Sequence, residues 1–248
     1  MSTVTTPEVV YEDSDGEPIS DNTLQFRWIV TLQGGLDALF HTNPDVFVAG
    51  DLLWYPVEGR PDLRAAPDVL VAFGRPKGDR GSYRQWVEGG IAPQVVFEVL
   101  SPGNRAGEMA KKLLFYEAHG VEEYYVYDPD RVTLAGYLRD RAGQFDEVPV
   151  MDGHVSPRLG IRFELADELI VSSPGGGRFL TYLESIRQFE SERAEAERER
   201  AEAASERAKA ESERAKAESE RAKAAAAEAK VEALRAKLRA AGIDPDAV

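Results

Sequence analysis

The chain has 248 residues, 43% of them hydrophobic, with no cysteine and a formal net charge of −14. This length corresponds to one or two domains, and the hydrophobic content is sufficient for a packed core. The lack of cysteine excludes disulfides and thiolate metal sites, and the three histidines stand at no spacing that resembles a zinc ligand set.

Charge and hydropathy bear on location and partners. The sequence shows no secretory signal and no apolar run near the ~20 residues that span a bilayer, so we expect a cytoplasmic protein with no membrane partner. Residues 190–248 carry 15 acidic and 13 basic side chains, which leaves about −12 of net charge on the rest of the chain. This acidic charge on residues 1–189 is unfavourable for sequence-independent DNA binding, because such binding depends on clustered lysine and arginine side chains.

Residues 1–175 predict one domain with a mixed α/β pattern. Ser20 or Asp21 can cap a helix that runs to about Phe40, because apolar residues recur there at helical spacing. Five strands and a second helix follow, and the continuous apolar run at 94–100 predicts a strand buried on both faces. The expected elements are strands at 46–55, 68–73 and 94–100, a helix at 105–119, and strands at 123–127 and 132–138.

Composition changes near residue 175, and no glycine or proline occurs between Arg178 and Gly242. The segment 205–211 recurs at 212–218, so the period is seven, and alanine and serine form a heptad seam with charges on the other faces. Residues 178–241 therefore predict a long helix. It is either a solvated single helix or a weakly paired coiled coil that joins copies of the chain into a homo-oligomer.

Two acids stand inside apolar strand sequences: Asp68 in the segment 67–71 and Glu98 in the segment 95–100. Desolvating an ionised carboxylate is costly unless a partner compensates it, and a cation is one such partner. Two carboxylates at neighbouring strand ends, together with the main-chain carbonyl of Val99, suit the oxygen coordination of magnesium or manganese. The alternative is that each acid only caps a turn or pairs with an arginine.

The helix that follows Glu98 adds a lysine. Arg105, Glu108 and Lys112 are spaced by three and four residues, so they share one face, next to an apolar stripe that ends at Tyr116 and should pack on the sheet. From this face Lys112 can reach the strand ends, where it would orient the attacking water or stabilise charge on a phosphate. Alternatively, Lys112 is an ordinary surface lysine.

A basic and aromatic cluster lies in sequence between the two acids. It can overhang the site and contact backbone phosphates, or it can be an ordinary solvated loop. The basic residues of this cluster are Arg75, Lys77, Arg80 and Arg84.

Four motifs in order carry a family resemblance. They are Ala66-Pro67-Asp68-Val69-Leu70-Val71, the segment 95–102 around Glu98, the segment 112–116 that begins with Lys112, and the segment 120–129. Together they resemble the Uma-type restriction-endonuclease family of bacteria over roughly residues 10–170, and the helical tail resembles one subgroup of it. The resemblance implies a PD-(D/E)XK restriction-endonuclease-like core with a mixed sheet, and Asp68 and Glu98 as the metal-binding acids.

The resemblance also implies a displaced lysine. In the parent motif a lysine follows two residues after the glutamate, where this chain has Leu100, and the family has it on the next helix, at Lys112. Glu108 and Arg105 match positions near the site where the family often has an acid and an arginine. At Gln25 some relatives have a histidine that contributes to the site.

The sequence thus predicts an endonuclease that uses Mg²⁺ or Mn²⁺ to hydrolyse DNA phosphodiester bonds. A non-catalytic interaction protein, in which the nuclease fold is a scaffold and the helical tail pairs, is the alternative that the acidic charge of residues 1–189 favours. A metal-dependent hydrolase of another phosphodiester is the third possibility.

Overall fold

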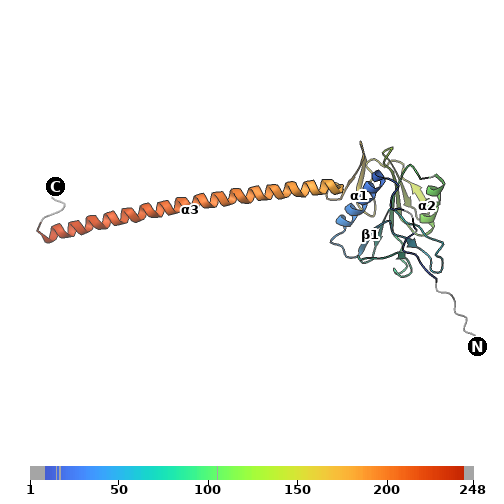
Figure 1. The fold of residues 1–248 in the computed structure, drawn as a ribbon, viewed down its shortest axis with the longest axis horizontal. Coiled ribbons are helices and arrows are strands. Elements are labelled where there is room, and N and C mark those ends of the chain that lie inside the picture. The colour runs from blue at the N-terminus through green and yellow to red at the C-terminus, as the bar shows by residue number, and fades with distance from the viewer. Residues whose placement is uncertain (1–8, 15, 17, 105, 243–248) are drawn as a thin grey trace, which may run out of the picture. The chain divides into compact units, whose positions relative to one another are not determined.

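The computed structural model describes residues 9–14, 16, 18–104 and 106–242. The chain divides into two compact units, Met1–Ser185 and Ile186–Val248. The first unit contains helices α1 (Thr23–Leu39) and α2 (Ala106–Ala118) and the strands, and the second contains most of helix α3 (Tyr182–Ala240) (Figure 1).

A six-stranded mixed sheet forms the centre of the first unit, with the order β1-β3-β5-β6-β7-β8. Strands β5 and β6 run parallel, and the other neighbours in this sheet run antiparallel. Helix α2 is the crossover connection that a parallel pair requires. The strands are β1 (Val46–Gly50), β3 (Val69–Phe73), β5 (Val95–Val99), β6 (Glu123–Asp128), β7 (Thr133–Arg139) and β8 (Phe145–Glu147).

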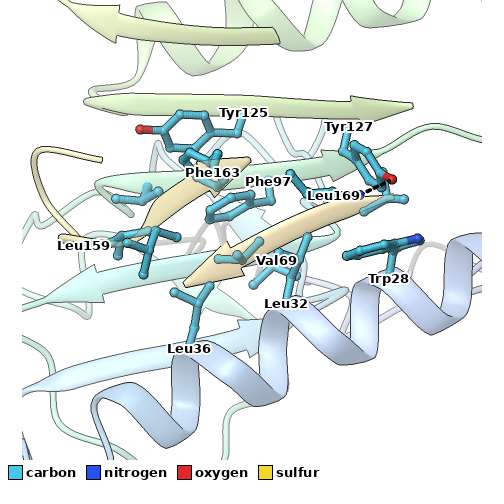
Figure 2. Close-up of a cluster of buried hydrophobic side chains, with 14 of the residues drawn as sticks. Trp28, Leu32, Leu36, Val69, Phe97, Tyr125, Tyr127, Leu159, Phe163 and Leu169 are labelled. Atoms are coloured by element: carbon cyan, nitrogen blue, oxygen red, sulfur yellow. Dashed lines mark hydrogen bonds between the residues drawn. The ribbon is translucent and has the colours of Figure 1, made fainter. Parts of the chain in front are cut away.

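Alternation along the strands divides the core into two clusters, one on each face of the sheet. Val69 and Val71 pack in the cluster that contains α1, whereas Leu70 and Ala72 pack in the cluster that contains residues of α2. The hairpin of β9 (Arg162–Leu165) and β10 (Leu169–Ser172) adds side chains to the α1 cluster (Figure 2). Because both faces are covered, the central strands have the continuous apolar sequences seen above.

Figure 2 also shows how this hairpin is fixed on the sheet. The backbone N–H of Leu169 donates a hydrogen bond of 3.2 Å to the hydroxyl of Tyr127 on β6. The ring of Tyr127 packs edge-on against Trp28 of α1, with the centroids 4.8 Å apart. One tyrosine therefore connects the sheet to both elements that cover this face.

The sequence prediction was wrong in two details near the first helix and strand. The N-cap of α1 is Asn22, not Ser20 or Asp21, because the Asn22 side chain accepts hydrogen bonds from two N–H groups of the first helical turn. The strand expected at 46–55 is two strands, β1 and β2 (Trp54–Tyr55), of which β2 pairs with β4 (Tyr83–Arg84) in a separate small sheet. Asp51 has φ of 48°, and this left-handed residue interrupts the extended chain.

The C-terminal end of α2 is anchored to the sheet by Arg139 of β7. Its guanidinium group donates hydrogen bonds to the main-chain carbonyls of Tyr116, Glu117 and Val121. This places a positive charge at the negative end of the helix dipole. Gly120, with φ of 98°, turns the chain out of the helix. The hydrogen bonds from Arg139 attach the last turn of α2, which carries Tyr116, to β7.

Helix α3 has 59 residues, all within the described part of the chain, and none of them is buried. The helix expected at residues 178–241 therefore corresponds to Tyr182–Ala240. Among the helices that the structure describes, none is both long enough and apolar enough to cross a membrane.

Candidate active site

Asp68 and Glu98 are neighbours across two antiparallel strands. Val69 of β3 pairs with Phe97 of β5, and the same register continued by one residue sets Asp68 opposite Glu98. Residues directly opposite each other in this way have Cβ atoms roughly 4.5–5.5 Å apart. The backbone N–H of Val99 donates a hydrogen bond of 2.6 Å to Oδ2 of Asp68, which agrees with that register.

The carboxylate of Glu98 is held at both oxygens by side chains of α2. Lys112 Nζ donates to Oε2 at 2.6 Å, and the hydroxyl of Tyr116 donates to Oε1 at 2.6 Å. The two donors are four residues apart, so they lie on one face of the helix. Glu98 is 3% exposed, and the Lys112 ammonium group is the positive charge that compensates its burial.

A cleft of about 600 Å³ opens beside this cluster and is lined by Asp68 and Lys112. Glu98 is not among the lining residues, but its Oε2 atom is bonded to Lys112 at the cleft wall. The other polar side chains that line the cleft among the described residues are those of Ser20, Asp21, Gln25, Asp51, Asn104 and Glu108. Among the described residues, four acidic side chains and one ammonium group therefore line the cleft, and carboxylate oxygens are ligands suited to a hard cation.

The pKa values of Asp68 and Lys112 are both raised, but for different reasons. Burial raises the pKa of Asp68 well above its ordinary value, the charges of Glu98 and Asp51 raise it further, and Lys112 and the Val99 N–H oppose this only in part. Burial acts to lower the pKa of Lys112, but the adjacent Glu98 carboxylate outweighs it, so that pKa is raised. Asp68 thus lacks a full counter-charge, while Lys112 stays protonated.

The donors at this point fit a magnesium or manganese ion. The carbonyl of Val99 accepts a 2.7 Å hydrogen bond from Nε2 of Gln25, and a carbonyl or carboxylate oxygen has a second lone pair that remains for a metal. Within the described residues, no group of three or more His, Asp or Glu side chains gathers as a metal site. Two carboxylates are enough for magnesium, which usually retains several water ligands.

Three more residues were expected near the metal-binding acids: Gln25, Glu108 and Arg105. Gln25 is buried and joins α1 to β5 through its bond to the Val99 carbonyl. Glu108 lines the cleft. Arg105 lies outside the described residues.

The four basic residues proposed to contact phosphate are all in ion pairs with acids. Glu88 pairs with both Arg75 and Arg80, and it is itself buried. Lys77 pairs with Asp37, and Arg84 pairs with Asp13 at 3.8 Å. None of the four is among the residues that line the cleft.

Sequence reasoning missed the roles of Tyr116, Asp51 and Asp21. Tyr116 was assigned to the apolar stripe, although its spacing of four from Lys112 puts its hydroxyl on the same face. Asp51 was placed inside a strand, but it follows β1, which ends at Gly50, and it lines the cleft. Asp21 is not the helix cap, and its carboxylate accepts a hydrogen bond from the hydroxyl of Ser101.

A mixed sheet with a helix on each face and two acids beside a lysine at the margin of the sheet forms a restriction-endonuclease-like α/β core. The chain belongs to the Uma2 family, described as "Putative restriction endonuclease", whose model matches residues 4–172. The family predicted from the sequence motifs is therefore confirmed, as is the fold class.

Other comparisons are more distant. A crystal structure from Anabaena variabilis, described as that of "a putative nuclease belonging to DUF820", is 16% identical to this chain. The match covers 61% of this chain and 84% of that one, with a TM-score of 0.42. None of the curated proteins matches the chain.

Replacing Asp68 by asparagine should change how stability depends on pH. Folding raises the pKa of Asp68, so the folded protein binds this proton more readily than the unfolded chain, whose value is about 3.9. The wild-type protein should therefore gain stability relative to Asp68→Asn as the pH falls through the raised value. Thermal unfolding of both proteins without divalent ions, at a series of pH values, measures this. A difference in Tm that is the same at every pH would contradict the assigned shift.

Proposed function

We propose that this protein is an endonuclease that uses Mg²⁺ or Mn²⁺ to hydrolyse phosphodiester bonds of DNA. The observation that carries the proposal is the pair of Glu98 on β5 and Asp68 directly before the adjacent strand β3, with Lys112 bonded to Glu98 and Asp68 lining the cleft. Membership of a restriction-endonuclease family supports the same activity.

In this proposal Asp68, Glu98 and the carbonyl of Val99 hold the divalent ion. A divalent cation bound there supplies a water of lowered pKa and a positive charge beside the scissile phosphate. Lys112 stays protonated because its pKa is raised, so it acts as a charge and hydrogen-bond donor towards the phosphate or the water, and not as a base. Glu108 and Gln25 support the site from the cleft wall and from behind the Val99 carbonyl.

The charge of the cleft sets an order of binding. Among the described residues, four acidic side chains line it beside one ammonium group, so a bound cation would reduce the repulsion of DNA phosphates. The metal therefore binds before the DNA or together with it. Contacts with DNA phosphates stay a prediction for the four basic residues Arg75, Lys77, Arg80 and Arg84. For each contact, the basic side chain would have to leave its acidic partner and bind a phosphate instead.

For the helical tail we propose pairing with a second copy of the chain. In the heptads 205–211 and 212–218, serine and alanine occupy the seam positions, and the flanking positions hold lysine on one side and glutamate on the other. In a parallel pair in register, Glu211 of one helix faces Lys216 of the other and Glu218 faces Lys223, whereas an antiparallel pair sets like charges together. This charge pattern favours a parallel homodimer. A cytoplasmic location also stays a prediction.

The nuclease proposal predicts that Glu98→Gln abolishes metal-dependent cleavage. The substitution keeps the size of the side chain and removes the charge that binds the metal. Nicking of supercoiled plasmid with MgCl₂ or MnCl₂ should fall by more than the roughly 10–100-fold that outer-shell partners of a metal cost. Glu147→Gln, which removes an exposed carboxylate on β8, is the matched control and should cleave like the wild type.

Equal nicking by Glu98→Gln and wild type would rule out this site. A wild-type protein that binds metal but cleaves no DNA would favour either the non-catalytic scaffold or a hydrolase of another phosphodiester. Assay of the same variants on RNA and on small phosphodiesters separates these two.

The pairing proposal predicts that the double variant Lys216→Glu, Lys223→Glu dissociates to monomers, because each substitution sets glutamate against glutamate across the seam. Sedimentation velocity of the full chain over a concentration series measures the change. The control is Arg214→Glu, Arg221→Glu, which changes the net charge equally at outward positions of the same heptads. A monomeric wild type, or equal behaviour of the two double variants, would contradict parallel pairing.

A further inference from the structure

The sequence placed Tyr116 in an apolar stripe of α2, but its hydroxyl group contacts the carboxylate of Glu98. The side chain is fully buried beneath α2, yet its oxygen is 2.6 Å from Oε1 of Glu98 and donates a hydrogen bond to it. The hydroxyl is the donor in this bond, because an ionised carboxylate can only accept.

A neighbouring tyrosine provides an internal comparison. Tyr124 of β6 is 1% exposed, and its ring lies 5.0 Å from that of Tyr116, centroid to centroid. Among the described residues its hydroxyl has no hydrogen-bond partner. Two tyrosines thus lie in one buried cluster, but only the hydroxyl of Tyr116 bonds to the carboxylate, so the two hydroxyl groups can be removed separately with similar loss of volume.

The bond from Tyr116 restricts the orientation of the Glu98 carboxylate. With Oε1 held by the hydroxyl, the carboxylate cannot rotate freely about its last bond, and Oε2 stays directed at Lys112 on the cleft wall. Arg139 donates a hydrogen bond to the main-chain carbonyl of Tyr116 and so holds the backbone that carries this side chain. Hydrogen bonds of this kind to a metal-binding carboxylate commonly set the affinity for the metal.

We propose that Tyr116 is a positioning residue, which holds the carboxylate of Glu98 in the orientation that binds the divalent ion. Tyr116 does not contact the metal or the DNA in this scheme, and it acts through Glu98 alone. The inference rests on the proposed metal-dependent function of this site. It assigns to one buried hydroxyl a share of the metal affinity that the neighbouring hydroxyl of Tyr124 does not have.

The test compares Tyr116→Phe with Tyr124→Phe in the full chain, and both substitutions keep the aromatic ring and its packing. Calorimetric titration with MnCl₂ should show a Kd for Tyr116→Phe that is raised about 10–100-fold, whereas Tyr124→Phe should bind within about twofold of the wild type. In plasmid nicking, Tyr116→Phe should need a correspondingly higher Mn²⁺ concentration for half-maximal rate, and its rate at saturating Mn²⁺ should approach that of the wild type.

The outcomes separate this inference from the function on which it rests. Thermal unfolding without metal first establishes that both variants are folded. If the wild type binds Mn²⁺, Glu98→Gln does not, and Tyr116→Phe binds as tightly as the wild type, the positioning role is overturned and the proposed function stands. If the wild type binds no Mn²⁺, both are overturned. A rate for Tyr116→Phe that stays low at saturating Mn²⁺ would also contradict a role through metal affinity alone.

Discussion

Two buried acids lie side by side where two antiparallel strands meet: Glu98 within β5, and Asp68 directly before β3. The pairing of β3 with β5 brings Asp68 and Glu98 together at the margin of the sheet, and one lysine is the only ammonium group that lines the adjoining cleft among the described residues. A pair of buried like charges destabilises a fold unless positive charge offsets it. The raised pKa of Asp68 shows that Lys112 offsets it only in part. A divalent cation would supply the remainder, so the same imbalance that costs stability favours metal binding.

Helix α2 contributes most of what surrounds this pair. It is the crossover between the parallel strands β5 and β6. It therefore passes over one face of the sheet, and the side chain of Glu98 projects from this same face. Lys112 and Tyr116, one turn apart, then reach the two oxygens of Glu98. Arg139 anchors the C-terminal end of this helix through the main-chain carbonyl of Tyr116. The topology of the sheet therefore also determines the geometry of the site.

Much of the core was predictable from local sequence, and much of the site was not. Buried strands such as β3 and β5 are nearly continuous apolar runs, so an acid within or directly before such a run is conspicuous, and Glu98 and Asp68 were found for that reason. The break at Asp51 depends on a single left-handed residue, which no periodicity marks. The ion pair of Arg84 with Asp13, like that of Lys77 with Asp37, joins residues far apart in the sequence, so only the fold could reveal it.

The proposed function requires that Asp68 and Glu98 bind one divalent ion between them. Crystals grown with MnCl₂ and measured at the manganese absorption edge can establish this, because anomalous scattering locates the ion independently of any assay. We expect a single strong peak between the carboxylates of Asp68 and Glu98, beside the carbonyl of Val99, and its loss in Glu98→Gln. Manganese bound only elsewhere on the acidic surface, with Lys112 still bonded to Glu98, would contradict it.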